Sequence, residues 1–249
     1  MVTETDGVIL RQTKTVNDRI ILVLLTRKLG KISAGTGTRT FGKRKSSLPL
    51  RAFTHGRYQL YSGRQIYNVD SADVIESFYG IGENPDSFFC ASYVLEFTDR
   101  VLPEGMPAEH VLDTLTGMLR ILSRRKTRLK SLLLMYQWKV LQILGYMPGL
   151  DACVRCGSTE EPAGLSVVDG GIICGHCRDS GTVNMRLLYE LNFDIIQILK
   201  FIQKNEIEAF SKLTFRDDTV EHLGRILESY LSYHLDVRDL RSASYINFD

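Results

Sequence analysis

The sequence lacks any hydrophobic run long enough to cross a membrane, because no window approaches the about 18 apolar residues that a span requires. The opening "MVTETDGVIL" also lacks the cationic stretch and apolar run of a secretory leader. We therefore expect a cytosolic protein. Its 249 residues are enough for two modest domains or one large one with a core that needs no covalent staples.

Motifs of the common catalytic sites are missing as well. There is no G-x-S-x-G, no H-E-x-x-H and no paired-carboxylate motif, and the five histidines are scattered: His55, His110, His176, His222 and His234. The stretch "AGTGTRTFGKRKS" (34–46) comes close to a phosphate-binding P-loop. However, Arg44 stands where that loop needs Ser or Thr, and Pro49 argues against a helix starting there. The sequence therefore favours a protein that is not an enzyme.

Cysteine is scarce, and its placement is informative. An odd count of five in a chain without a leader argues against a disulfide framework. Cys90 stands alone on the apolar side of a predicted helix and is expected to be a buried small hydrophobe. The other four form C-x2-C, seventeen residues, C-x2-C, at Cys153, Cys156, Cys174 and Cys177.

This spacing predicts a zinc ribbon. Two thiolate pairs supply the tetrahedral set of four sulfurs that Zn²⁺ prefers, and because no position remains for water, one structural ion is expected. A hairpin turning at Asp169-Gly170-Gly171 would bring the second pair back to the first, and His176 would stay exposed. A redox dithiol is the alternative, although neither pair is expected at a strand-to-helix step of a βαβ unit.

Acidic residues are few in the first third of the chain. Residues 1–80 contain 13 Lys and Arg against 6 Asp and Glu, a balance of +7, and leave 18 against 23, or −5, for the rest. A basic segment with interleaved aromatic residues suggests a polyanion partner, although a solvated basic face would look the same. A second basic cluster, "RRKTRLK" (124–130), could equally cap a helix C-terminus.

The periodicity divides the chain into an N-terminal β part and a helical part. Five short strands with a long basic loop, between residues 6 and 76, fit a barrel of the oligonucleotide-binding (OB) type. Helices are expected from Asp86 as cap, from Pro107 as first residue, and over 128–144 as a buried central helix; two more, over 186–203 and 218–235, follow the cysteines. The fold class is thus α+β, with segments 1–80 (OB fold), 81–150 (helical), 151–182 (zinc ribbon) and 183–249 (helical).

Basic side chains on the barrel and in the second cluster are the candidates for binding a phosphate backbone, and exposed aromatic rings could stack on bases. Alternation should bury about half of the aromatic candidates Phe41, Phe53, Tyr58, Tyr61 and Tyr67. The predicted DNA-binding residues are Arg19, Arg27, Lys28, Lys31, Arg39, Lys43, Arg44, Lys45, Arg124, Arg125, Lys126, Arg128 and Lys130.

Over essentially its full length the sequence resembles the family of the bacterial recombination mediator RecO. The resemblance lies in "GVILRQTKTVNDRIILVLLTRKLGKISAGTGTRTFGKRKS", "LPLRAFTHGRYQLYSGRQIYNVDSADVIESF", "ASYVLEFTDRVL", "LQILGYMPGLDACVRCG" and "ILESYLSYHLDVRDLRS". The order of these elements is more specific than the cysteines alone, since four-cysteine ribbons occur in unrelated proteins.

The resemblance implies an OB barrel, a helical bundle and a zinc site at Cys153, Cys156, Cys174 and Cys177. It implies binding of single- and double-stranded DNA, annealing of complementary strands, and work with RecR and the tail of the single-stranded-DNA-binding protein to load RecA. It assigns the DNA role of the loop to Arg39, Lys43, Arg44 and Lys45, and it implies a cytoplasmic, nucleoid-associated protein. An RNA-binding module, a protein adaptor and an enzyme with zinc or dithiol chemistry are the alternatives.

Overall fold

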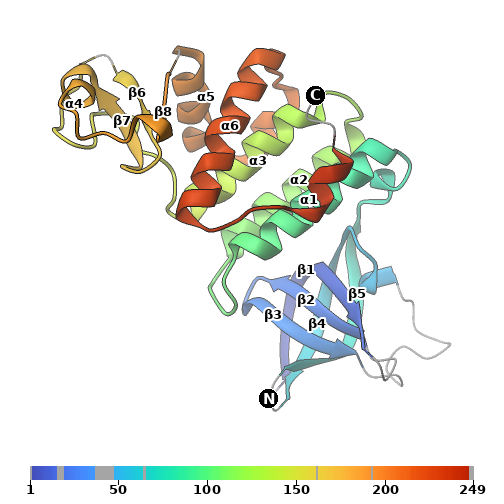
Figure 1. Cartoon of the computed structure of the whole chain (residues 1–249). Coiled ribbons are helices and arrows are strands. Elements are labelled where there is room, and N and C mark those ends of the chain that lie inside the picture. Colours follow the sequence, from blue (N-terminus) through green and yellow to red (C-terminus); the bar gives the residue numbers. More distant parts are fainter. Residues whose placement is uncertain are drawn as a thin grey trace. The chain divides into compact units, whose positions relative to one another are not determined.

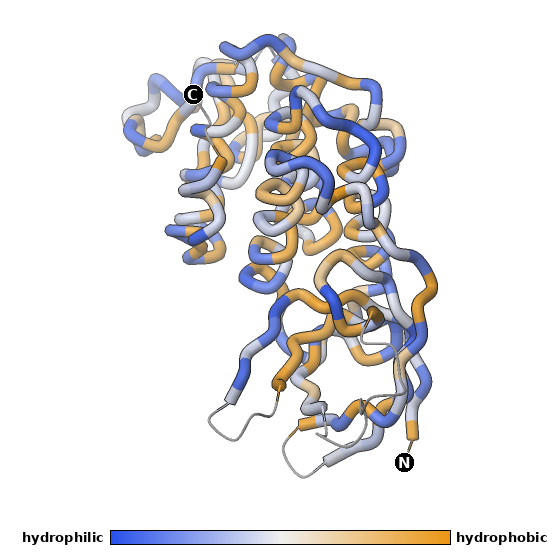
Figure 2. Tube along the Cα trace, turned by 90° about the vertical axis from the view of Figure 1, so that its right-hand side faces the viewer, coloured by the Kyte–Doolittle hydropathy of each residue, from blue (hydrophilic) through white to orange (hydrophobic). Residues whose placement is uncertain are grey.

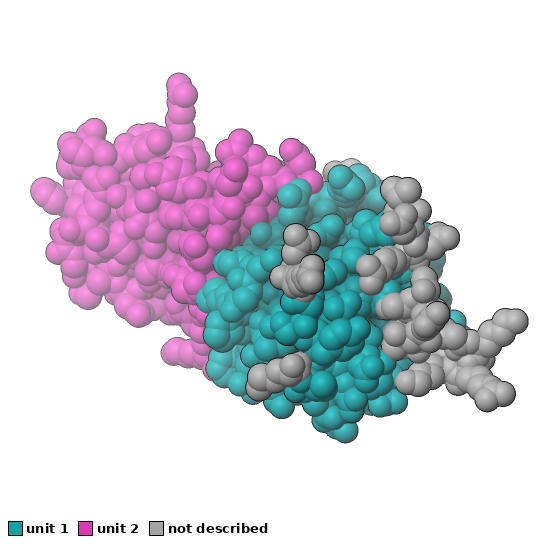
Figure 3. Space-filling model, turned by 90° about the horizontal axis from the view of Figure 1, so that it is seen from below, with its two compact units in different colours: residues 1–129, 240–247 teal, residues 130–239, 248–249 magenta. Residues whose placement is uncertain are grey.

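The computed structural model describes residues 2–15, 20–36, 48–63, 66–160, 162–191 and 193–246, with only the backbone at 193. The chain forms two compact units (Figure 3), Met1–Leu129 with Leu240–Asn247 and Lys130–Asp239 with Phe248–Asp249. No helix within the described ranges is long and apolar enough to span a membrane.

A closed five-stranded barrel begins the first unit (Figure 1). Its strands are β1 (Val2–Lys14), β2 (Ile20–Thr26), β3 (Gly30–Thr36), β4 (Thr54–Ser62) and β5 (Tyr67–Ser77), in the order β1-β2-β3-β5-β4. β1 is shared by two partners: residues 2–8 pair with β4, and residues 7–14 pair with β2, with a shift of register between Ile9 and Arg11. Such a bulge bends the strand, and the short parallel pairing of β3 with β5 closes the barrel. The predicted OB-type barrel is confirmed.

Alternation fills the barrel interior with apolar side chains. Leu22 and Leu24 of β2, Ile32 and Ala34 of β3, and Leu60 of β4 point inward and are almost completely buried. Since successive side chains of a strand face opposite sides, these i, i+2 pairs line one face of each strand. Figure 2 shows hydrophobic and hydrophilic stretches along the chain in both the barrel and the helices.

Two helices and a returning C-terminal segment complete the first unit. These are α1 (Pro85–Val101), α2 (Glu109–Arg124) and the 3-10 segment η5 (Arg241–Tyr245). The carboxylate of Glu96 on α1 accepts the backbone N–H groups of Arg241 at 2.9 Å and Ser242 at 2.8 Å. Burial raises the pKa of Glu96, but these bonds and the Ser242 hydroxyl outweigh it and lower the pKa. A charged acceptor therefore fixes η5 on α1.

The second unit is built on α3 (Leu129–Ile143). Its apolar residues are buried on every side, and Trp138 and Tyr136 have no exposed surface. The ring of Trp138 lies 5.6 Å from that of Tyr230 on α6 (Asp217–His234), and α5 (Phe193–Lys204) is the other long helix of this unit. The predicted buried central helix is confirmed, and it ends at Ile143, shortly before Gly145, whose φ is +82°.

Three predicted helix boundaries differ from the structure. Asn84, not Asp86, caps α1, because its Oδ1 accepts the N–H of Ser87 at 2.8 Å with Pro85 at the first helical position. α2 begins at Glu109, two residues after Pro107. The helix expected over 186–203 begins only at residue 193, because Leu188–Tyr189 form a strand, β8, paired with β6 (Pro162–Ser166).

The cysteine-bearing segment lies inside the second unit. β6 and β7 (Gly171–Cys174) form the predicted hairpin, and with β8 they make a three-stranded sheet ordered β7-β6-β8. The short helix α4 (Gly175–Asp179) follows β7. The compact units do not follow the four segments expected from the sequence, since α1 and α2 belong with the barrel. The boundaries at residues 80, 150 and 182 stay a prediction.

Gly30 allows the barrel to approach the loop between α1 and α2. It has φ +66°, and a Cβ there would lie 2.0 Å from the carbonyl oxygen of Met106, whereas Gly105 has φ +71° and open space around it. We expect Gly105→Ala to cost about 1 kcal/mol of unfolding free energy, for left-handed backbone alone. Gly30→Ala should cost about 1–3 kcal/mol more, because Met106 must also move. Urea denaturation of both variants measures the difference, and equal losses would contradict the close approach.

Candidate metal centre and nucleic-acid interface

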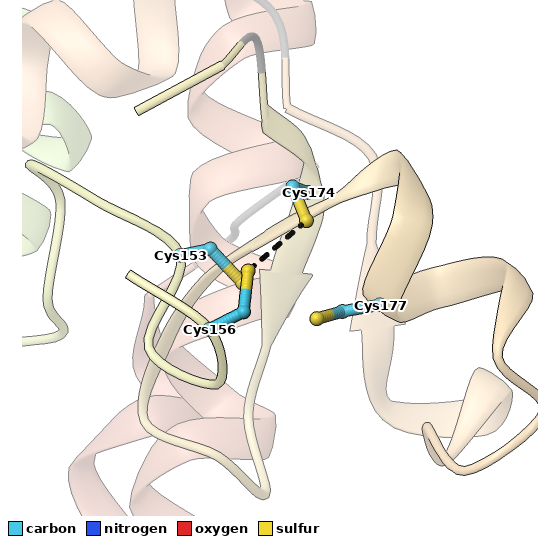
Figure 4. Close-up of side chains that lie close together, drawn as sticks. All are labelled: Cys153, Cys156, Cys174 and Cys177. Atoms are coloured by element: carbon cyan, nitrogen blue, oxygen red, sulfur yellow. Dashed lines mark hydrogen bonds between the residues drawn. The ribbon is translucent and has the colours of Figure 1, made fainter. Parts of the chain in front are cut away.

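The four predicted ligand sulfurs come together. Cys153 and Cys156 lie on the turn before β6, Cys174 ends β7, and Cys177 lies on α4 (Figure 4). Their sulfur atoms all lie within 4.8 Å of one another, and those of Cys156 and Cys174 are 3.6 Å apart. Cys153, Cys174 and Cys177 are buried and Cys156 is exposed, while His176 points to solvent as predicted.

Backbone amides and crowding set the electrostatics of the cluster. Burial raises the pKa of Cys153, but backbone hydrogen bonds from Cys174, Cys156 and Arg155 outweigh it and lower the pKa to about 6. Neighbouring thiols, Cys156 first, raise the pKa of Cys177 to about 12. Four thiolates this close repel one another unless a cation lies among them. The donor set and its amide support therefore fit a bound metal ion with four sulfur ligands.

Arg155, between the first two cysteines, ties together the pieces of the centre. Its Nε donates to Asp169 Oδ1 at 2.9 Å in the β6–β7 turn, and its Nη2 donates to the carbonyl of Thr182 at 3.1 Å beyond α4. Sequence spacing did not identify this residue. Its position inside C-x2-C was the only available signal, because the partners lie 14 and 27 residues away.

The turn that carries Cys153 and Cys156, the first knuckle of the centre, packs closely against the backbone of β7. Gly149 and Ile172 are linked by a 2.9 Å hydrogen bond, and a Cβ on Gly171 would lie 2.4 Å from the Val154 side chain and 2.7 Å from the Gly149 oxygen. The centre is joined to α6 by His234, whose Nε2 lies 2.7 Å from the carbonyl oxygen of Val167. The cysteine cluster is therefore part of the packing of its unit.

The second cysteine pair does lie between a strand and a helix, contrary to the sequence expectation for either pair. β7 ends at Cys174 and α4 begins at Gly175. The surrounding sheet is antiparallel, however, so the pair is not in a βαβ unit. In addition, Cys153 and Cys156 face this pair, and such an arrangement of four sulfurs is typical of a metal centre.

Cys90 does not belong to the cluster. It is buried on α1, and burial raises the pKa of its thiol to about 12.

Arg27, one of the predicted DNA-binding residues, is paired with three carboxylates. Its guanidinium donates to Asp6 at 3.1 Å, to Glu109 at 2.9 Å and to Asp113 at 2.7 Å, which joins β1 to α2. The pKa of Arg27 is raised, chiefly by the hydrogen bond to Asp113. Burial raises the pKa of Asp6, but hydrogen bonding to His55 and the charge of Arg27 outweigh it and lower the pKa.

Lys31 and Lys28 differ in how far their ammonium groups are buried and paired. The ammonium of Lys31 is buried and donates to the carbonyl oxygen of Asp99 and, at 3.3 Å, to its Oδ1. Lys28 is exposed at the rim of a cleft of about 550 Å³, whose lining also includes Tyr67 and Glu104. Of these three predicted residues, only Lys28 therefore presents its charge mainly to solvent.

The second basic cluster meets the start of α1. Lys126 Nζ donates to the Gly80 carbonyl at 2.6 Å and to the Ser123 carbonyl in the last turn of α2 at 3.4 Å, so Lys126 also caps α2, whereas Arg125 Nε donates to the Thr127 carbonyl beyond the helix at 3.0 Å. Arg124 and Arg128 are exposed, and Lys130 is half-buried in the second unit. The remaining predicted residues lie outside the described ranges: Arg19, Arg39, Lys43, Arg44 and Lys45.

Of the four aromatic candidates that the structure describes, one is fully buried, fewer than the half expected from alternation. Tyr58 is fully buried, and its hydroxyl donates to the Pro49 carbonyl at 2.9 Å. Tyr61 is exposed, Phe53 and Tyr67 are half-buried, and Phe41 is outside the described residues. The exposed rings of Tyr79 and Phe88 were not among the candidates, because they follow the barrel in the sequence.

Comparison with known proteins identifies the family. A model described as the N-terminal part of recombination protein O matches residues 1–78, and one described as its C-terminal part matches residues 82–244. The chain belongs to the RecO family. The family resemblance expected from the sequence is thereby confirmed.

The similar curated proteins are named DNA repair protein RecO. That of Pelotomaculum thermopropionicum is 30% identical over 98% of this chain and 93% of its own length, and that of Alkaliphilus metalliredigens is 28% identical over 95% of each. That of Symbiobacterium thermophilum is 27% identical over 97% of this chain. The chain is thus a RecO-family DNA repair protein over nearly its full length.

Removal of one sulfur tests the metal centre. We expect Cys174→Ser to lower bound zinc in the purified protein from about one ion per chain to a small fraction, because three sulfurs bind less tightly than four. Cys90→Ala is the matched control and should retain the metal. Elemental analysis after dialysis measures the content, and full metal content in Cys174→Ser would contradict a four-cysteine site.

The adjacent residues Arg27 and Lys28 allow a paired cation to be compared with one that faces solvent. Arg27→Gln should lower the unfolding free energy by about 1–2 kcal/mol, because three carboxylates lose a partly exposed partner. Lys28→Gln should change it by less than about 0.5 kcal/mol. The lowered pKa of Asp6 gives stability that is present above its unfolded pKa of about 4 and lost as pH falls through the folded value. The loss in Arg27→Gln should therefore shrink in urea titrations below about pH 4, and a pH-independent loss would contradict the ion pairs.

Proposed function

We propose that this protein is a recombination mediator that binds single- and double-stranded DNA, anneals complementary strands and, with RecR and the single-stranded-DNA-binding protein, promotes loading of RecA. Its membership of the RecO family carries the proposal. The closed OB-type barrel supports it, because such barrels bind nucleic acid with one sheet face and its loops. The chemistry proposed is non-catalytic.

The basic charge of the barrel segment supplies a mechanism. Two strands repel each other as polyanions, and Lys and Arg that replace condensed counterions lower that repulsion. Because Arg27 and Lys31 are held by carboxylates, we assign the main DNA contacts of this segment to Lys28, to Arg19 and to the residues of the basic loop expected from the sequence, Arg39, Lys43, Arg44 and Lys45. Phosphate contacts of this kind give strong salt dependence without sequence preference.

The metal proposed for the cysteine centre is Zn²⁺ in a structural role. Four sulfurs leave no open position for substrate or water, so Cys153, Cys156, Cys174 and Cys177 would hold the ion and supply no reaction. The apolar residues packed there are few, chiefly Ile173, Val183 and Leu188, so metal bonds would supply stability that so small a core lacks.

Strand annealing over a salt series tests the function. The variant Arg39/Lys43/Arg44/Lys45→Glu should lose annealing. Its log–log slope of single-strand affinity against salt should become shallower by up to about 3, since each phosphate contact contributes about 0.7. The matched control reverses four exposed charges in the second unit, at Lys204, Lys212, Arg216 and Arg225, with the same formal change. It should retain most of the annealing activity.

Other outcomes would point to the alternatives. If folded wild-type protein anneals no DNA but binds single-stranded RNA in direct competition, an RNA-binding module is the better description. If both four-residue variants keep the wild-type function in recombination, the protein acts as an adaptor. Annealing that is insensitive to salt would overturn the counterion mechanism.

A further inference from the structure

Three exposed or half-exposed aromatic residues meet on the first unit, outside the interior of the barrel. Phe53 precedes β4, Tyr79 lies in the turn after β5, and Phe88 lies on the first turns of α1. Tyr79 is 77% exposed and Phe88 is 45% exposed. Since each ring comes from a different segment, the surface exists only in the folded unit.

The rings of Phe53 and Phe88 contact each other, and a backbone hydrogen bond places the residue before Tyr79 beside Phe53. The rings of Phe53 and Phe88 are 5.4 Å apart and nearly perpendicular. The backbone N–H of Phe78, the neighbour of Tyr79, donates to the Phe53 carbonyl at 3.1 Å. Phe89 continues the series, with its ring stacked on that of Tyr245 at 5.3 Å. Edge-to-face and stacked pairs of this kind hold rings in defined orientations.

The basic end of α2 lies directly beside these rings. A Cβ on Gly80 would be 2.4 Å from the Ser123 carbonyl oxygen, so the turn that carries Tyr79 packs on the last turn of α2. Lys126 donates to the Gly80 carbonyl at 2.6 Å, and the hydroxyl of Ser87 donates to the Arg125 carbonyl at 3.4 Å. Tyr79 thus directly precedes, and Phe88 directly follows, a residue that contacts the same basic segment.

The charge around the rings is positive but not uniform. Arg51, Arg124 and Arg128 are exposed, and Arg125 and Lys126 are half-exposed. Burial and then the charge of Arg128 lower the pKa of Arg125, as expected for crowded cations. Two acids, Glu83 and Asp86, lie on the same segment, while Arg120 pairs with Glu76 at 2.6 Å. An anion that contacts the rings would therefore meet more positive than negative charge.

We propose that Tyr79 and Phe88, the latter oriented by Phe53, form a base-stacking platform for single-stranded DNA, with Arg124, Arg125 and Arg128 neutralising the phosphates beside the stacked bases. The proposal rests on the DNA-binding function proposed above and names residues that select the single strand. Rings stack on unpaired bases of any sequence, whereas a duplex keeps its base faces covered. Cations alone contact both forms through their phosphates.

An acidic peptide is the competing occupant of this surface. Aromatic rings beside guanidinium groups suit a strand, which offers bases for stacking and phosphates for ion pairing, and this favours nucleic acid. The described cleft of about 550 Å³ is lined by other residues, among them Lys28, Ser33 and Glu104. The aromatic residues are thus not among the residues named for this cleft, and their exposed rings offer faces on which a base can lie.

The test compares single-stranded oligo(dT) with a DNA hairpin duplex at one salt concentration. Tyr79→Ala and Phe88→Ala should each weaken binding of oligo(dT) about tenfold and binding of the duplex less than about twofold. Phe88→Trp should keep the affinity, because it keeps an aromatic face. Tyr233→Ala removes an equally exposed aromatic residue from α6 and should change neither affinity. Thermal unfolding of each variant confirms that the fold is intact.

A fluorescence measurement reports stacking directly. The single native tryptophan, Trp138, is completely buried. In Tyr79→Trp, quenching by oligo(dT) would therefore come from the introduced ring, and we expect strong quenching by oligo(dT) and little by the duplex. Unchanged affinities together with an unquenched Trp at position 79 would overturn the platform.

The remaining outcomes are also decisive. If the alanine variants bind oligo(dT) as the wild type does, the platform is wrong and the DNA-binding function stands. If affinity for both DNA forms falls equally, the rings do not select the single strand. If the wild type binds neither DNA, the proposed function fails. Loss of binding to an acidic, aromatic-containing peptide, with DNA binding unchanged, would assign the surface to a protein partner.

Discussion

The ion pairs between the barrel and the two helices of its unit decide which basic residues remain available to a polyanion. Arg27 contacts Glu109 and Asp113 on α2, and Arg11 and Lys31 contact Asp99 on α1. Each pair removes a cation from the group that could contact phosphate and at the same time joins a strand to a helix. The same acids would repel DNA if they were unpaired, so pairing also reduces a barrier to binding. Excess charge in the first third of the chain is therefore divided between holding the unit together and facing solvent.

The cysteine centre depends on a different electrostatic balance. Backbone amides near Cys153 favour its thiolate, while crowding by neighbouring sulfurs disfavours ionisation of Cys177. A divalent cation removes that conflict, and Arg155 and the close approach of Gly171 to Gly149 keep the two knuckles together. The hydrogen bond between His234 and Val167 extends this order to α6. The centre thus acts on its unit through packing, which agrees with a structural role for the metal.

Local patterns made the barrel, the buried α3 and the metal ligands predictable. Short β-branched runs between turns mark the strands, an apolar sequence on all sides marks α3, and the C-x2-C spacing marks the ligands, so each signal lies within a few residues. The cap at Asn84 was missed because Asp86 offers a similar carbonyl two residues later, and β8 was missed because its pairing with β6 outweighs a helical pattern. The partners of Arg27 were not predictable, since Glu109 and Asp113 lie more than 80 residues away. The aromatic surface was missed for the same reason, as three separate segments form it.

A protein that anneals strands must bind its substrates without holding its product equally tightly. Cations alone cannot meet this condition, because a duplex has more closely spaced phosphates than a single strand and gains as much from them. Rings such as Tyr79 and Phe88 add binding energy that exists only while bases are unpaired. When two strands pair, their bases leave the rings to stack within the duplex, and the aromatic part of the affinity is lost. With stacking side chains beside the basic end of α2, the affinity of the protein for DNA would therefore fall when the strands pair, which favours release of the duplex.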